Sequence, residues 1–396
     1  MGRPIDEAVN AMRSWGESRA WRGYDPYDAL NSPATPVLTL GTAIGRRLLT
    51  QLVKLSPVNL RPPLQIESAH NAKAIALVAS GYAWLSIRAD EEAGASARHW
   101  LSWLERNHNG GSDGIAWGYH FDVQTRVCFY PRGTPNTIAT SFAVGALLDG
   151  VELLGDERWL ETAVAACDYL VAHLLVEGSG GPYFRYVGAE DVLIHNANML
   201  ASAALARAGR LSGRTDLADV AARACRTTVS AQRPDGSWPY GRPKSLSWVD
   251  NFHTGYVLES LAECVRVVPD LHEQLRCGVA QWEQDLFLRD GTPKYMTGNL
   301  YPIDAHCYAT AIDTWLGQMH WHPKAVERAQ HLAVLEIERM LDSKGYIHFQ
   351  QRRFWKNRLP FVRWTTAPSF RALSRLLAAL EKRSVAYAVT ESAGTR

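Results

Sequence analysis

The sequence predicts an all-α fold, an (α/α)6 toroid in which six helical hairpins close into a ring. Five loops with a glycine near their start and aromatic residues after it recur along the chain, at 112–122, 179–188, 234–243, 289–298 and 343–352. An apolar helical run follows each loop, and more polar amphipathic segments lie between the runs. The runs are evenly spaced: 60 residues separate Asn136 from Asn196, 55 separate Asn196 from Asn251, and 54 separate Asn251 from Ala305.

The length of this repeat favours a closed ring over an open solenoid. Tetratricopeptide and HEAT repeats are only about 34–47 residues long and lack an aromatic loop. Hairpins that cannot bury their apolar faces alone stack on one another. In a ring, outer helices cover the inner ones, so the inner helices are expected to be apolar nearly all round. The glycine loops should then gather at one end and form a funnel lined by the starts of the inner helices.

The elements follow in chain order from this unit. Residues 1–33 are expected to form an N-terminal extension that could cover the funnel, residues 34–385 a single toroid domain, and residues 386–396 a flexible tail. The segment 37–55 is expected to supply the outer helix before the first inner run. The inner helices are expected to start near Glu67, Asn136, His195, Asp250, Asp304 and Trp364, and the outer helices to lie at 95–106, 156–175, 215–232, 269–287 and 323–342.

Composition excludes several classes of function. The 42 Lys and Arg residues nearly balance 40 Asp and Glu, which argues against a nucleic-acid partner. No uncharged apolar stretch reaches the ~18 residues of a membrane span, and no signal peptide is evident, so we predict a cytoplasmic protein without a membrane span. Phosphate-loop, HExxH and CxxC motifs are absent, so we predict no cofactor and no metal. The 14 Trp and 15 Tyr residues suit a cleft that stacks on flat ligands such as sugars.

Polar residues at the starts of the inner helices are the candidate catalytic groups. Asp250 and His253 are three residues apart and share a helix face, which suits a carboxylate that orients an imidazole for general acid/base work. Asp304 and His306 occupy the corresponding place one hairpin later, and Glu67 supplies another carboxylate. The alternative is structural: Asp is a favoured N-cap residue, and His253 could be a hydrogen-bonded core residue.

Further residues are candidate substrate-binding groups, because aromatic planes with interleaved Arg suit sugar stacking and a carboxylate or phosphate clamp. Asp25 and Asp28 join them if the extension folds over the funnel; otherwise they are turn residues. The alternative for the aromatic rings is that they only close the tops of the hairpins. The candidates are His70, Asn136, His195, Asn198, Trp117, Tyr119, Tyr183, Arg185, Trp238, Tyr240, Arg363 and Trp364.

Two segments and the overall length carry a family resemblance. WRGYDPYDALNSP at 21–33 and SWVDNFHTGYVLESL at 247–261 resemble bacterial α/α-toroid, six-hairpin proteins of exopolysaccharide biosynthesis clusters. Related toroids include unsaturated glucuronyl hydrolases, N-acylglucosamine 2-epimerases and polysaccharide lyases. The resemblance implies a carbohydrate ligand in the funnel, an oligosaccharide or polysaccharide that could be acidic.

A second resemblance is local. QRPDGSW at 232–238 is similar to the QxxxGxW repeat of terpene cyclases, but the DxDD and DDxxD motifs of those enzymes are missing. A simpler interpretation is that Gln232, Gly236 and Trp238 tie an outer helix to its loop.

Three hypotheses follow from these observations. The first is a carbohydrate-active enzyme that acts on a polysaccharide or its oligosaccharide precursor as a hydrolase, lyase or epimerase. The second is a non-catalytic sugar-binding or scaffold protein of a polysaccharide assembly complex. The third is an isoprenoid cyclase, which would need an apolar funnel.

Overall fold

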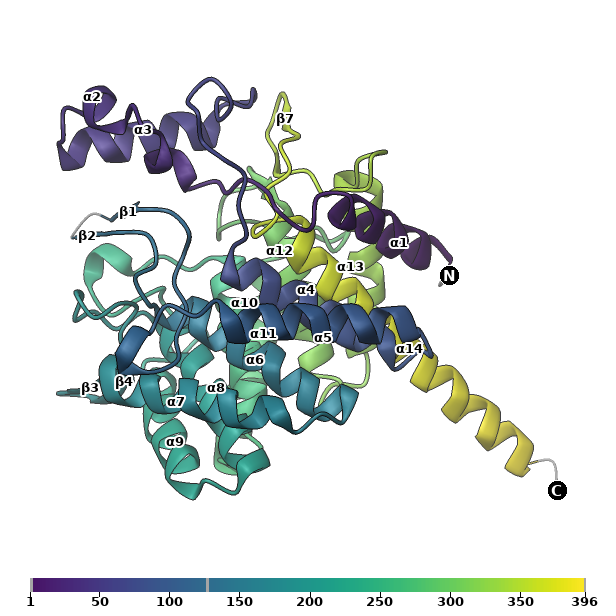
Figure 1. Cartoon of the computed structure of the whole chain (residues 1–396). Helices are drawn as coiled ribbons and strands as arrows, with labels where there is room; N and C mark the ends of the chain where they lie inside the picture. The colour runs from purple at the N-terminus through teal and green to yellow at the C-terminus, as the bar shows by residue number, and fades with distance from the viewer. Residues whose placement is uncertain (1–2, 126–127, 395–396) are drawn as a thin grey trace.

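The computed structural model describes residues 3–125 and 128–394, and most of them lie in helices packed side by side (Figure 1). The helices are arranged as hairpins in a closed ring. Each inner helix contacts the next around the ring, and the last contacts the first. The predicted toroid is therefore confirmed. The inner helices are α4 (Ala72–Ser86), α6 (Thr137–Leu154), α8 (His195–Ser212), α10 (Asn251–Cys264), α12 (Ala305–Gly317) and α14 (Thr366–Gly394).

The outer layer differs from the prediction at one place. The N-terminal helix α1 packs against α14 and α13 as the sixth outer helix, so it belongs to the ring and not to an extension of it. Its buried residues Ile5, Val9 and Met12 have the spacing of one helix face. The outer helices are α1 (Arg3–Glu17), α5 (Glu91–Arg106), α7 (Arg158–Leu174), α9 (Thr215–Val229), α11 (His272–Asp285) and α13 (Ala325–Met340).

The segment 37–55 was therefore wrongly predicted to be an outer helix. It forms α2 (Thr35–Thr39) and α3 (Ala43–Leu55), which lie beside the ring at the top of the view in Figure 1. Helix α3 packs against α2, the short 3-10 helix η1 (Asp28–Asn31) and the strand β1 (Val123–Gln124). The place beside α14 is already occupied by α1, which is why an equally amphipathic segment is left outside. The predicted tail lies within α14 as far as Gly394, and 395–396 lie outside the described residues.

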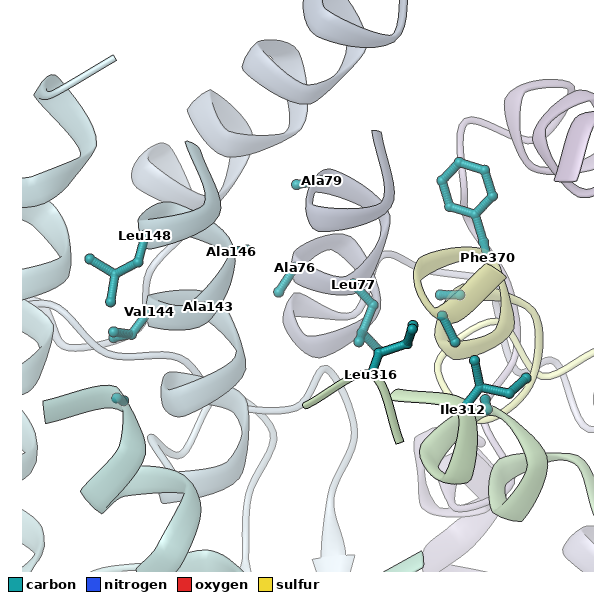
Figure 2. Close-up of a cluster of buried hydrophobic side chains, with 14 of the residues drawn as sticks. Ala76, Leu77, Ala79, Ala143, Val144, Ala146, Leu148, Ile312, Leu316 and Phe370 are labelled. Carbon is teal, nitrogen blue, oxygen red and sulfur yellow. The ribbon is translucent and has the colours of Figure 1, made fainter. Parts of the chain in front are cut away.

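Small side chains let the inner helices approach closely around the core (Figure 2). Ala76 and Ala79 of α4 and Ala143 of α6 are fully buried or nearly so. Leu316 of α12 and Phe370 of α14 fill the space on the other side of α4. Among the described residues, α6 alone is long and apolar enough to cross a membrane, and its burial as an inner helix accounts for that apolarity.

The glycine loops gather at the end of the ring where the inner helices begin, as predicted. Each of the five repeated loops contains at least one glycine with a positive φ, a conformation that L residues with a Cβ rarely adopt. Short strands β2 (Phe129–Tyr130), β3 (Leu175–Gly178), β4 (Gly181–Phe184), β5 (Ile303–Asp304), β6 (Gln350–Gln351) and β7 (Lys356–Asn357), and 3-10 helices η2 (Gly111–Asp113), η3 (Lys244–Leu246) and η4 (Pro269–Leu271), complete the described elements. The strands pair antiparallel as β1–β2, β3–β4 and β5–β6–β7.

Candidate functional site

The candidate site lies at the loop end of the ring, where four inner helices are capped by their own side chains. Asn71, Asn136, Asp250 and Asp304 each accept a hydrogen bond from a backbone N–H in the first turn of the helix that follows. These caps fix where the helices start. They therefore also fix the side chains one to three residues further on, which line the centre of this end.

Asp250 and His253 form a close pair at the mouth. One carboxylate oxygen of Asp250 accepts the backbone N–H of His253 at 3.0 Å, and the other lies 2.6 Å from His253 Nδ1. The indole N–H of Trp248 also reaches that second oxygen, at 3.3 Å. The Asp250 side chain is only 3% exposed, whereas that of His253 is 24% exposed. With Nδ1 engaged, Nε2 is the nitrogen of His253 left to meet a ligand.

Aromatic rings surround His253. The rings of Tyr240 and Trp248 stack at 4.8 Å with their planes 11° apart, and Tyr240 lies 4.5 Å from the imidazole. Phe252 covers the other side at 3.9 Å. Beneath Tyr240 a cavity of about 10 Å³ is lined by His195 and His253, among others, and is large enough for about one water molecule.

His195 lies deeper than His253. Its Nδ1 is 3.1 Å from the Thr228 hydroxyl, and its buried Nε2 has no partner among the described residues. Burial lowers the pKa of His195 to about 4, so the ring is neutral at physiological pH. His195 therefore borders the site as a neutral polar group.

A buried hydrogen-bond chain crosses the centre of the ring below the mouth. The carbonyl of Trp364 can only accept, so His306 donates from Nδ1 to it at 2.8 Å. His306 Nε2 then accepts the Tyr256 hydroxyl at 2.8 Å, and that oxygen accepts from Lys73 Nζ at 3.2 Å. Burial holds the pKa of both Lys73 and His306 well below their usual values. Phe252 separates His306 from His253, lying 5.1 Å from the first ring and 3.9 Å from the second.

The carboxylate of Asp304 is fully buried and fully engaged. It accepts from the His306 backbone N–H at 2.8 Å, from Trp364 Nε1 at 3.1 Å and from Gln350 Nε2 at 2.5 Å. Burial raises the pKa of Asp304. This geometry suits a helix cap and a support for the Trp364 ring, which stacks on His306 at 4.5 Å. Asp304 and His306 are thus close to His253 but not open to the mouth.

The segment after α1 contacts the loops at this end of the ring. Asp25 accepts two hydrogen bonds from the Arg363 guanidinium, one of them from Nη2 at 2.8 Å, and Asp28 pairs with Arg61 at 2.7 Å. Arg363 also lies 4.9 Å from the Tyr119 ring. Both Asp residues are buried, and the Arg363 pair holds the pKa of Asp25 below its usual value against the effect of burial. They therefore hold the segment in place and do not face a ligand.

His70, Asn198 and Arg185, also predicted as site residues, have structural partners. Glu67 is exposed in the loop before α4, and His70 Nε2 donates to the Ala20 carbonyl at 2.7 Å. Asn198 links α8 to α9 and β4. Arg185 reaches Asp191 and the His173 carbonyl.

The predicted loop aromatics divide between packing and the site. The indole N–H groups of Trp117 and Trp238 donate to Leu104 and Thr228 carbonyls in the core, and Tyr183 is buried on β4. Gln232 donates to the Gly236 and Gln274 carbonyls, so the QxxxGxW segment does tie its loop to an outer helix. Of the loop rings predicted, Tyr240 borders His253.

Lys73, Tyr256 and Phe252 were not predicted. Lys73 and Tyr256 lie inside apolar helical runs, where the sequence pattern indicates burial and nothing marks a polar chain. A lysine two residues after a capping Asn in an inner helix is the one signal that could have found the chain.

A second cavity lies at the other end of the ring. It measures about 370 Å³ and is lined by the later turns of the inner helices, including Arg207, Arg371 and Arg375. These guanidiniums pair with acids of neighbouring helices: Arg207 with Asp149 at 2.7 Å and Arg375 with Glu259 at 3.0 Å. Such pairs join the inner helices where the apolar core ends.

Comparison with known proteins places the fold. No protein-family model and no curated protein matches the chain. Among solved structures, a cellobiose 2-epimerase from Bacillus thermoamylovorans B4167 matches with a TM-score of 0.66 at 10% identity, covering 95% of this chain and 99% of that one. An unsaturated glucuronyl hydrolase specific for heparin matches with a TM-score of 0.64 at 13% identity, covering 96% and 97%.

The chain shares the fold of these enzymes. A GH76 α-mannanase from Bacteroides thetaiotaomicron also matches, with a TM-score of 0.62 at 13% identity over 81% of this chain and 89% of that one. The expected fold likeness to glucuronyl hydrolases is confirmed, and sugar epimerases also match in fold. At these identities the likeness concerns the fold, so activity must be argued from the site.

Proposed function

We propose that the chain is a carbohydrate-active enzyme in which His253 transfers a proton to or from a saccharide. The observation that carries the proposal is the Asp250–His253 pair, because Asp250 holds Nδ1 at 2.6 Å and leaves Nε2 at the partly open mouth. A carboxylate that orients an imidazole and raises its basicity is a standard general acid/base device. The stacked Tyr240 and Trp248 rings offer an aromatic wall for the apolar face of a sugar.

The site favours epimerisation or elimination over glycoside hydrolysis. Most glycosidases use two carboxylates on either side of the scissile bond. Here Asp304 is buried with its oxygens engaged, Glu67 is exposed in the loop before α4, and Asp250 is held by His253. A single accessible imidazole suits removal of a proton from a carbon beside a carbonyl or carboxylate, which both an epimerase and a lyase require.

The polar chain from Lys73 to His306 argues against an isoprenoid cyclase, which would need an apolar funnel. A role in exopolysaccharide biosynthesis and a cytoplasmic location remain part of the proposal.

The test is proton exchange in deuterium oxide. Reducing disaccharides and uronate-containing oligosaccharides are incubated with the protein, and NMR detects deuterium at the reacting carbon, epimer formation or an unsaturated uronate. We expect His253→Gln to lower turnover by about 10²–10⁴-fold, the usual contribution of a general acid/base. Asp250→Asn should lower turnover while α10 remains capped, because Asn is as good an N-cap as Asp.

The chain supplies a matched control pair. His348 Nε2 lies 2.9 Å from Asp342, in the loop after α13. Neither His348→Gln nor Asp342→Asn should change turnover. New reducing ends in place of exchange would indicate a hydrolase, and binding across the panel without turnover would favour the scaffold hypothesis.

A further inference from the structure

We propose that the loop end of the ring docks on a bilayer that contains anionic lipids, through α3 and the tip of the β6–β7 hairpin. Helix α3 exposes an apolar stripe at helical spacing: Ile44 is 69% exposed, Leu48 65% and Leu52 60%. Val53, on the opposite face, is buried. In the ring helices the apolar stripe faces the core, whereas in α3 it faces outward, where contiguous apolar surface marks an interaction site.

Two further apolar side chains are exposed at this end of the molecule. Phe354 at the tip of the β6–β7 hairpin is 87% exposed, and Trp355 beside it is 40% exposed. The base of the hairpin touches the end of α3, because Asn357 Nδ2 donates to the Ser56 carbonyl at 3.1 Å. In Figure 1 the hairpin and the α2–α3 pair project beyond the ring together. Exposed aromatic rings of this kind suit the interface between water and lipid.

The charges of the segments around α3 and the hairpin favour a lipid surface over a second copy of the chain. Neither 29–66 nor 343–380 contains an Asp or Glu, whereas both contain exposed arginines, Arg47 in the first and Arg353 and Arg358 in the second. A twofold contact between two copies through these two segments would set their arginines against each other, and neither segment supplies an acid to pair with them. Anionic lipid headgroups attract such residues, and an amphipathic helix with basic flanks lies in the membrane interface.

This docking also favours a substrate class, a step that rests on the proposed function. The mouth beside His253 opens at the end of the ring that carries α3 and the hairpin. On a membrane it would face the lipid surface. A saccharide carried on a lipid anchor is therefore the favoured substrate class for the proposed proton transfer.

Vesicle flotation tests the docking without reference to catalysis. The full chain is mixed with vesicles of phosphatidylcholine alone or of phosphatidylcholine with phosphatidylglycerol. We expect it to float with the anionic vesicles and to be released by added salt. The double variant Leu48→Glu/Leu52→Glu should bind at least about tenfold more weakly, since it places charge where the stripe meets lipid. The control Met319→Glu changes a residue that is 40% exposed at the opposite end and should bind like the wild type.

The outcomes separate the alternatives. Wild-type protein that does not float, or a double variant that floats equally well, would overturn the docking. A concentration-dependent dimer that the double variant abolishes, without vesicle binding, would assign the surface to a second copy. His253→Gln should lose turnover and keep vesicle binding. The double variant should keep turnover of a free saccharide and lose any preference for the lipid-linked form, and a wild type without that preference would overturn the substrate class alone.

Discussion

The carboxylate of Asp250 makes two different contacts with His253. One oxygen caps α10 through the His253 backbone N–H, and the other holds the His253 ring. The start of the helix and the orientation of the imidazole are thereby fixed by the same group. Capping and catalytic positioning are alternatives when the residues are considered one by one, but the geometry allows both. An Asn at this position would still cap α10, but it would bring no negative charge to the His253 ring.

Glu336 gives a prediction at the same scale. It is fully buried on α13, accepts from the Ser369 hydroxyl at 2.6 Å, and has one oxygen without a partner among the described residues. Burial raises the pKa of Glu336 to about 8. The unfolded chain loses this proton near pH ~4.3. The folded chain keeps it, so stability falls as pH rises from there to about 8.

Glu336→Gln should therefore be more stable than the wild type at alkaline pH. The difference should shrink toward acidic pH by up to about 1.4 kcal/mol per pH unit. Thermal unfolding followed by circular dichroism across this range measures it. Parallel curves for the two proteins at every pH would show that Glu336 does not bind its proton in this way.

At the scale of elements, α1 and α3 have similar amphipathic patterns, but the apolar face of α1 is buried and that of α3 is exposed. Met12 of α1 is fully buried against the ring, whereas Leu48 of α3 is 65% exposed. Only one helix can occupy the groove beside α14 and α13, and α1 occupies it. The apolar face of α3 is consequently left for another partner.

This difference predicts two contrasting stabilities. Met12→Ala should lower the free energy of unfolding by about 2–5 kcal/mol, the usual loss for a buried large residue. Leu48→Ala should change it by less than about 0.5 kcal/mol in the absence of lipid. Denaturant unfolding of both variants is the measurement. A large loss for Leu48→Ala would mean that α3 is packed in solution.

At the scale of the whole molecule, the ring is closed by polar contacts as well as by its core. Arg371 of α14 reaches Asp313 of α12 at 2.8 Å, Glu259 of α10 at 3.4 Å and Ser80 of α4 at 3.2 Å. It joins four inner helices near the large cavity. Burial raises the pKa of Asp313 to about 6 even with this guanidinium beside it.

Removing Arg371 should therefore destabilise the whole ring. Arg371→Leu should lower the free energy of unfolding by up to about 3–5 kcal/mol, because it leaves the buried carboxylate of Asp313 with Arg375 as its remaining ion-pair partner. The raised pKa of Asp313 would rise further, so the loss should be larger at pH values above about 6 than below. Arg276→Leu, which breaks the exposed pair with Glu273, is the control and should change stability little. Equal losses for the two variants, measured by denaturant unfolding, would contradict this role of Arg371.

Much of the architecture could be predicted because its signals are local. Repeated glycine loops, capping Asn and Asp residues and alternating apolar and amphipathic runs each act within a few residues, and together they place eleven ring helices in order. The site was predicted in part for the same reason: Asp250 and His253 share one helical turn. Lys73 and Tyr256 could not be found, because 183 residues separate the two partners of their hydrogen bond.

The sequence by itself determined the ring, its repeat and the end at which polar helix starts meet, since these follow from periodicity and turn chemistry. Only the tertiary structure decided which of two amphipathic helices completes the outer layer, and which polar groups are open to a ligand. Both depend on competition for the same space between distant segments. Glu67, Asp304 and His253 are alike as acid/base candidates in the sequence, and their burial and hydrogen-bond partners separate them.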